Sequence, residues 1–284
     1  MQKPSPAELA VALGSRASLI KQNLLATPGP NDEPPEVNLR TLKPPDPSAG
    51  LPEKEVLDPK LEHSRVLVHK YLAALPNFTA DEAMTFYSSP KLASPRWKVE
   101  ESMRTEAVFH GGEETRRNVV INGVKWEDTA FLPSAVRANP STLRLSQIFR
   151  TDCQVIVGFE KRVVEAGTPM LVYRFAAPRD LCFGEVYDNN YQRYFPGYEG
   201  EVFVAEADGL TRRIECASSG FPAEFNDQRV EERTAWDQVK IGDESHLLPV
   251  SAERLVVTKS VMLLSVAKYS NHRHFEASTS ITFH

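Results

Sequence analysis

The stretch "EGEVFVAEADGLTRRIEC" (199–216) contains the strongest hairpin signal in this chain of 284 residues. Two runs of alternating character flank Asp208-Gly209, and Asp-Gly is a dipeptide that two-residue hairpin turns prefer. Alternation with a period of two places apolar side chains on one face of a strand. The stretch therefore predicts two antiparallel strands joined by a tight turn.

Similar hairpin patterns recur along most of the chain. The segments 153–176 and 237–257 contain turns built around Ala-Gly and Gly-Asp, and 77–89, 96–110 and 114–126 alternate loosely and end in turn residues. Consecutive hairpins without helices between them indicate an antiparallel sheet. We expect a mainly β protein of the α+β class, with one long sheet of about ten strands that must curl or be covered.

Two or three helices are expected to cover the concave face of the sheet, and two of them lie among or just before the strands. Asp58 and Pro59 are typical of the start of a helix over about 58–74, which Pro76 ends. A second apolar stretch, "PSTLRLSQIFR" (140–150), has helical spacing. These helices are the expected covers for the apolar, concave face of the sheet.

The N-terminal part of the chain differs from the rest. Residues 7–26 have apolar residues at helical spacing, and residues 27–52 contain eight of the 21 prolines, which favours an extended linker. The sequence thus predicts an N-terminal helix (1–26), a Pro-rich linker (27–52) and one antiparallel domain (53–284).

Composition restricts the function. The net charge of −5 argues against non-specific binding of nucleic acid, which requires a basic surface. The longest apolar run, "VMLLSVA" (261–267), is far shorter than the roughly 20 residues that cross a bilayer as a helix. The N-terminus as given lacks the features of a signal peptide, although it could equally be a mature end preceded by a start methionine. Three cysteines are too few for a disulfide scaffold, and a Cys182–Cys216 bridge stays open beside the alternative of buried thiols.

The C-terminal segment "YSNHRHFEASTSITFH" (269–284) raises the question of a metal site. His272 and His274 point to the same face if they lie on a strand, and His246 or His284 could add a third ligand. No spacing here specifies the accompanying carboxylate, so solvent-facing histidines are the simpler interpretation, with a metal-dependent hydrolase as an alternative.

Other catalytic or cofactor motifs are missing from the sequence. GxSxG, GxGxxG, the P-loop and CxxC do not occur. Carboxylate doublets such as Glu231-Glu232 point to opposite faces of a strand, so they do not form a facing pair. We expect no catalytic residues, no cofactor and no metal.

Aromatic residues spread through the predicted strands are the remaining candidates. Most such residues form a core, but a curved sheet with few helices on its concave face can leave room for an apolar ligand. The candidate lining residues are Phe86, Trp97, Phe149, Phe175, Phe203 and Trp236.

Several segments carry a family resemblance. "LPNFTADEAMTFY" (75–87), "YEGEVFVAEADGLTRRIE" (198–215), "AWDQVKIGDESHLLPVSAE" (235–253) and "YSNHRHFEASTSITF" (269–283) resemble a group of uncharacterised exported bacterial proteins. That group is similar in architecture to the outer-membrane lipoprotein carriers, the LolA-like proteins. The likeness covers roughly residues 58–284.

The resemblance has implications for fold and function. It implies an unclosed antiparallel barrel with helices over an apolar cavity, export to the periplasm, and a non-catalytic role in binding a lipid, an acyl chain or a lipoprotein. It also implies that His272 and His274 lie on the wet face, because the group has Tyr at one of these positions. A protein that binds a partner through its N-terminal helix and Pro-rich linker (1–52) stays an alternative. The sequence leaves peripheral membrane contact and the oligomeric state open.

Overall fold

The computed structural model describes residues 58–90, 95–110, 113–126, 145, 147–149, 155–177, 186–187, 193–194, 196–218 and 220–275. The predicted N-terminal helix and Pro-rich linker, Cys153, Cys182 and His284 lie outside these ranges. The division of the chain into three parts therefore stays a prediction.

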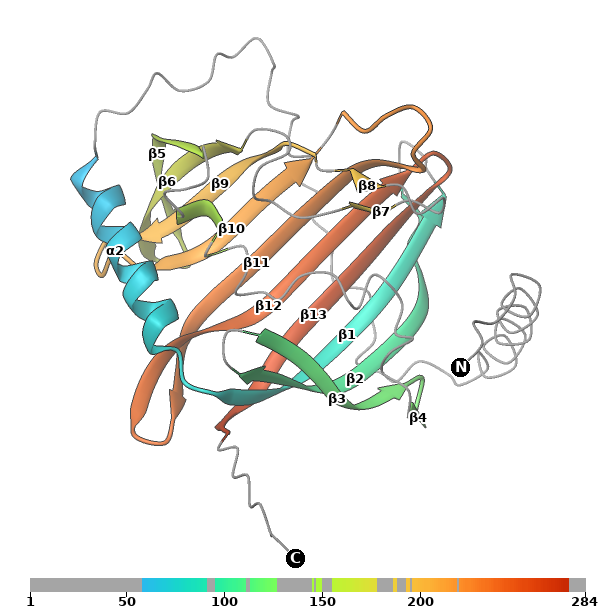
Figure 1. Cartoon of the computed structure of the whole chain (residues 1–284), viewed down its shortest axis with the longest axis horizontal. Coiled ribbons are helices and arrows are strands. Elements are labelled where there is room, and N and C mark those ends of the chain that lie inside the picture. The colour runs from blue at the N-terminus through green and yellow to red at the C-terminus, as the bar shows by residue number, and fades with distance from the viewer. Residues whose placement is uncertain are drawn as a thin grey trace, which may run out of the picture.

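The described part is one large, curved antiparallel sheet with helix α2 (Pro59–Ala74) beside it (Figure 1). Its eleven strands follow the order β4-β3-β2-β1-β13-β12-β11-β10-β9-β6-β5, and the end strands β4 and β5 do not pair with each other. The strands are β1 (Phe78–Pro90), β2 (Lys98–His110), β3 (Glu113–Ile121), β4 (Val124–Lys125), β5 (Ile156–Glu165), β6 (Thr168–Ala177), β9 (Tyr198–Ala205), β10 (Thr211–Ser218), β11 (Asp227–Ile241), β12 (Glu244–Thr258) and β13 (Val261–His274). A separate pair consists of β7 (Val186–Tyr187) and β8 (Arg193–Tyr194).

The predicted hairpins are confirmed. β9 and β10 pair antiparallel around the Asp208-Gly209 turn, where Gly209 has φ +71°. The β5–β6 turn uses Ala166 at φ 46° and Gly167, and the β11–β12 turn uses Gly242 at φ 63°. These left-handed backbone conformations suit glycine, which has no Cβ to clash.

The order of the strands departs from a simple meander where β6 pairs with β9, past the separate β7–β8 pair, and where β13 meets β1. The last strand, β13, pairs with both β12 and β1. The N-terminal strands β1–β4 therefore join the sheet through its C-terminal strand. The hairpin patterns did not predict this long-range pairing.

Only part of the expected helical cover is described. Helix α2 begins and ends close to the predicted bounds, with Asp58 as its N-cap and Leu75 already extended. Of the second predicted helix, Leu145 and residues 147–149 are helical, and Leu145, Ile148 and Phe149 are buried. The expectation of two or three helices over a concave face is not confirmed.

One face of the sheet can be followed from strand to strand. Ile214, Thr234, Ala252, Ala267 and Met84 are successive cross-strand partners, so their side chains share a face. Ile214 packs in the same cluster as α2 residues, and we call this side of the sheet the α2 face. The alternating residues form the opposite face.

Two clusters of buried side chains lie on or against the α2 face. The first, here the α2 cluster, consists of Leu61, Val68, Leu145, Ile148, Phe149, Val157, Leu171, Tyr173, Phe175, Ala177, Tyr198, Val202, Val204, Ile214, Cys216, Trp236 and Leu247. The second, here the β1–β3 cluster, consists of Phe78, Ala80, Met84, Met103, Ala107, Phe109, Val119, Ile241, Leu248, Ala267 and Tyr269. Smaller clusters around Leu264 and Val172 lie on the opposite face.

Candidate apolar binding site beneath helix α2

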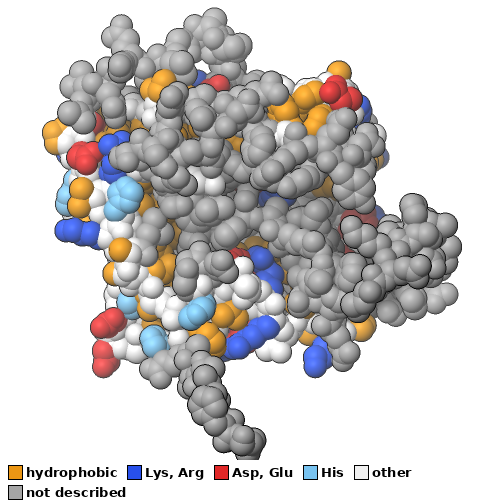
Figure 2. All heavy atoms as spheres, in the orientation of Figure 1, with side chains coloured by type: hydrophobic (Ala, Val, Ile, Leu, Met, Phe, Trp, Pro, Cys, Tyr) orange, Lys and Arg blue, Asp and Glu red, His pale blue; other side chains and the backbone are white. Residues whose placement is uncertain are grey.

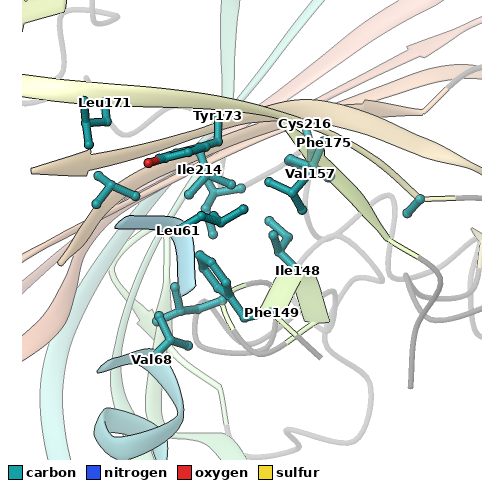
Figure 3. Close-up of a cluster of buried hydrophobic side chains, with 14 of the residues drawn as sticks. Leu61, Val68, Ile148, Phe149, Val157, Leu171, Tyr173, Phe175, Ile214 and Cys216 are labelled. Atoms are coloured by element: carbon teal, nitrogen blue, oxygen red, sulfur yellow. The ribbon is translucent and has the colours of Figure 1, made fainter. Parts of the chain in front are cut away.

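The α2 cluster lies between helix α2, the helical residues around Phe149, and strands β5, β6, β9, β10 and β11 (Figure 3). Strand alternation directs Leu171, Tyr173 and Phe175 of β6 toward the helix. Among the α2 residues whose side chains are described, Leu61, Ser64 and Val68 are buried. Of the described helical residues, α2 thus contributes two members of the cluster, and Leu145, Ile148 and Phe149 contribute three.

The N-terminal end of α2 is tied to the sheet by polar contacts. Asp58 Oδ1 accepts a hydrogen bond from the backbone N–H of Lys60 at 2.8 Å, and Asp58 Oδ2 accepts one from the Tyr173 hydroxyl at 3.1 Å. Lys60 Nζ lies 2.9 Å from Glu206 Oε1. Burial, together with the charge of Asp58, raises the pKa of Tyr173, so this tyrosine remains a donor.

The middle of α2 touches the β9–β10 turn. A Cβ on Gly209 would lie 2.8 Å from a ring carbon of His63 and 3.2 Å from Leu67 Cδ1. Farther along the helix, the ring Nε2 of His69 donates to the Phe149 carbonyl oxygen at 3.2 Å. The helix thus contacts the sheet and the β9–β10 turn at its edges, in addition to packing Leu61 and Val68 into the cluster.

In the described part of the chain, four neutral polar atoms at the α2 cluster are buried without a hydrogen-bond partner: Trp236 Nε1, the Tyr71 hydroxyl, Thr211 Oγ1 and Ser218 Oγ. Tyr71 packs against the cluster from α2, and Thr211 and Ser218 lie opposite cluster residues of β9. Burial raises the pKa of Tyr71, which keeps its hydroxyl neutral. Buried polar groups of folded proteins are nearly always paired, so these atoms are exceptional.

The structure brings three of the six predicted aromatic residues together. Phe149, Phe175 and Trp236 all belong to the α2 cluster, and each is at most 2% exposed. Phe175 lies opposite Gly200 of β9, where a Cβ would come within 2.0 Å of the Glu215 carbonyl oxygen. Glycine therefore allows the backbones to approach closely beside Phe175.

The other three predicted residues lie elsewhere. Phe86 is on the α2 face but packs against the β1–β3 cluster. Trp97 packs with Tyr87 on the opposite face. Phe203 is also on the opposite face, where the Arg213 guanidinium lies 3.8 Å from the ring centroid.

The α2 residues that cover the cluster were not predicted as part of a binding site. Leu61, Val68 and Tyr71 are spaced by seven and three residues, so they form one stripe of helix α2. This pattern is visible in the sequence and could have identified them. The candidate residues were selected only for being aromatic, and most of those lie in predicted strands, so the aliphatic residues of the helix were missed.

A buried ion group lies beside the β1–β3 cluster. Arg116 forms a two-pronged contact with Glu82, with N···O distances of 2.6 and 2.9 Å, and a third contact of 2.7 Å with Glu114. Burial disfavours the guanidinium charge, but the hydrogen bonds and charge of Glu82 outweigh it and raise the pKa of Arg116. Burial and the two carboxylates raise the pKa of neighbouring Tyr269.

The two C-terminal histidines differ in environment. His272 Nε2 donates to the Pro249 carbonyl oxygen at 3.0 Å, and its ring centroid is 5.9 Å from that of Phe78. Burial lowers the pKa of His272, while the Pro249 carbonyl and Asp81 act in the other direction. The expectation of a solvent-facing side chain is therefore wrong for His272, although His274 is exposed. Among the described residues, no group of three potential metal ligands forms.

The carboxylate doublet and the cysteine singled out in the sequence contact neighbouring side chains of the sheet. Glu231 and Glu232 point to opposite faces as predicted, and they pair with Arg229 and Arg254. Cys216 is buried in the α2 cluster, with its Sγ 3.9 Å from Glu232 Oε2. Cys216 is not in a disulfide. The alternative of a Cys182–Cys216 bridge is therefore wrong in this structure, and the alternative of a buried thiol holds for Cys216.

The surface that Figure 2 shows carries both signs of charge among apolar side chains. Within the described part of the chain, no helix combines the length and apolar character needed to cross a membrane.

Comparisons with known proteins return structures but no sequence relatives. No family model and no curated protein match the chain. Solved structures that match include a DUF1329 family protein from Desulfovibrio piger, at 8% identity and a TM-score of 0.35, covering 78% of this chain and 95% of the other. A LolA superfamily protein from Nitrosomonas europaea has 10% identity and a TM-score of 0.31, covering 76% and 94%. A domain described as an outer membrane lipoprotein-sorting protein from Vibrio parahaemolyticus has 8% identity and a TM-score of 0.35, covering 76% and 91%. One of these descriptions names the LolA superfamily, and another names an outer membrane lipoprotein-sorting protein.

Proposed function

We propose that this protein is a non-catalytic carrier that binds the acyl chain of a lipid or lipoprotein between helix α2 and the sheet. The observation that carries the proposal is the α2 cluster, a broad apolar surface of the sheet to which the described residues of helix α2 contribute only Leu61 and Val68. The ligand would take the place of helix contacts. The sequence resemblance to exported proteins supports a periplasmic location as part of the same proposal.

The energetics of such a site are favourable. Burial of one CH₂ group contributes about 0.8 kcal/mol, so ten groups give about 8 kcal/mol. That value corresponds to micromolar binding before the costs of ordering the ligand and moving the helix. An acyl chain of ordinary length thus has enough apolar surface to displace α2 from part of the cluster.

A photoreactive fatty acid tests where an acyl chain binds. After irradiation of the full chain, mass spectrometry of the peptides is expected to locate the label near Phe149, Phe175 and Trp236. Label confined to the opposite face, around Leu264, would place the binding elsewhere and contradict the proposal. The absence of specific labelling and of any response to fluorescent fatty acids would also contradict it.

Strand β6 provides a matched pair of variants. Leu171 points to the α2 cluster, and its neighbour Val172 points to the opposite face; both are buried. Leu171→Ala is expected to weaken acyl binding by about tenfold or more, because it removes apolar contacts from the site. Val172→Ala is expected to leave binding unchanged in protein that circular dichroism shows to be folded. Equal effects of the two variants would indicate general destabilisation rather than a site.

A further inference from the structure

The α2 cluster contains a strong hydrogen-bond donor that the described chain leaves unused. Trp236 is 2% exposed, and its Nε1 has no hydrogen-bond partner. An indole N–H can only donate, so no rotation or change of protonation turns it into an acceptor. In apolar surroundings such a donor is costly unless an acceptor reaches it.

A second donor comes from the helix that covers the cluster. Tyr71 follows Val68 by three residues on the packing side of α2, and its hydroxyl is buried without a partner. Thr211 Oγ1 is a third unpaired polar atom, and β11 passes beside its strand, with Ala235 opposite Arg213. The unpaired groups therefore come from both the sheet and its cover.

These donors favour a ligand that carries an acceptor oxygen. The α2 cluster itself consists of aliphatic and aromatic side chains and a thiol. Arg212, which follows Thr211 on β10, also has a buried Nη1 without a hydrogen-bond partner among the described residues. A pure hydrocarbon would leave the indole N–H unpaired. A carbonyl oxygen at the head of an acyl chain places an acceptor on an otherwise apolar ligand.

We propose that Trp236 determines ligand specificity by donating its indole N–H to the carbonyl oxygen at the head of an acyl chain, with the Tyr71 hydroxyl as a second donor. This inference rests on the proposed acyl-binding function. It assigns to the site a preference for acyl derivatives over hydrocarbons of equal length.

The full chain with ¹⁵N-labelled tryptophan tests the hydrogen bond directly. The chain has three tryptophans, and the Trp236 indole signal is the one that disappears in Trp236→Phe. Addition of methyl laurate is expected to move this signal downfield, whereas dodecane is expected to change it much less. Trp97, on the opposite face, is expected to show no change with either probe.

Affinities provide the second measurement. Loss of one neutral hydrogen bond corresponds to about a three- to tenfold loss of affinity. Trp236→Phe and Tyr71→Phe are each expected to weaken methyl laurate by this factor and to leave dodecane unchanged, with Trp97→Phe as the matched control. If Trp236→Phe does not fold, the signal is assigned by elimination with Trp97→Phe and Trp126→Phe, and Tyr71→Phe supplies the affinities.

The outcomes separate the two proposals. Binding of methyl laurate and dodecane with equal affinity, or an unmoved Trp236 signal on saturation with the ester, would overturn the role of Trp236 and leave acyl binding intact. Failure of both probes to bind the wild-type protein would instead overturn the proposed function.

Discussion

Replacement of Arg116 by Met is expected to destabilise the protein more than any equivalent change at an exposed arginine. The Arg116 side chain is 10% exposed and neutralises Glu82 and Glu114, whose side chains are 0% and 1% exposed. Met keeps the aliphatic bulk but removes the charge and all three charge-assisted contacts. Removing one partner of a buried ion pair typically costs about 3 to 5 kcal/mol, because the remaining charge is uncompensated.

Arg117 provides the control on the same strand. Its Nε lies 2.6 Å from Glu106 Oε2, which is as short as the Arg116–Glu82 contact, but its side chain is 49% exposed. An exposed pair contributes at most about 1 kcal/mol, because water solvates both charges once they separate. Arg117→Met is therefore expected to have a small effect even though the bond it removes has the same length.

Urea unfolding followed by tryptophan fluorescence measures both variants. For m of about 3 kcal/mol/M, Arg116→Met lowers the midpoint by about 1 to 1.7 M, and Arg117→Met lowers it by less than about 0.4 M. Adding Glu82→Gln to Arg116→Met is expected to recover part of the loss, since it removes one buried charge. Equal midpoints for the two single variants, or no recovery in the double variant, would refute the argument that burial sets the cost.

Three further expectations follow from other parts of the structure. Gly200→Ala is expected to lower the melting temperature strongly, because a Cβ there would lie 2.8 Å from Cys216 Cα and force β9 away from β10. Asp58→Ala removes the N-cap of α2 and the acceptor for Tyr173, which is expected to cost about 1 to 2 kcal/mol and to increase hydrogen exchange in α2 more than in β13. The pKa of His272 is lower in the folded protein than in the unfolded chain, where it is about 6.5. As the pH falls below that value, the unfolded chain binds the proton first. The contribution of His272 to stability is therefore present above about pH 6.5 and is lost as the pH falls through the folded pKa. Thermal unfolding between pH 7.5 and 5 is therefore expected to depend less on pH in His272→Gln, and an unchanged dependence would contradict this.

Local patterns predicted the elements well because local physics decides them. Asp58 caps the start of α2, and Pro59 supplies a backbone angle that suits the first helical position. Both residues are adjacent in the sequence, so a short local pattern predicts where the helix begins. The turn at Gly209 follows from its backbone conformation. The candidate site was predicted less completely. Phe203 has the same aromatic character as Phe175, but strand alternation places the two on opposite faces.

The buried hydrogen-bond donors were beyond the reach of local patterns. Trp236 and Tyr71 look like ordinary aromatic residues of a strand and a helix. Their polar atoms are buried without a partner only in the folded chain, where segments distant in sequence exclude water from them. The same applies to His272, whose half-buried position depends on Phe78, almost two hundred residues away along the chain.

By itself, the sequence determined an antiparallel, hairpin-rich domain, its first described helix and the absence of familiar catalytic motifs, since each depends on residues close together in the chain. The tertiary structure alone decided that β13 pairs with β1, and which aromatic residues meet beneath α2. These contacts join segments far apart in sequence. Their formation depends on the total burial and hydrogen bonding of the folded chain, which no short stretch contains.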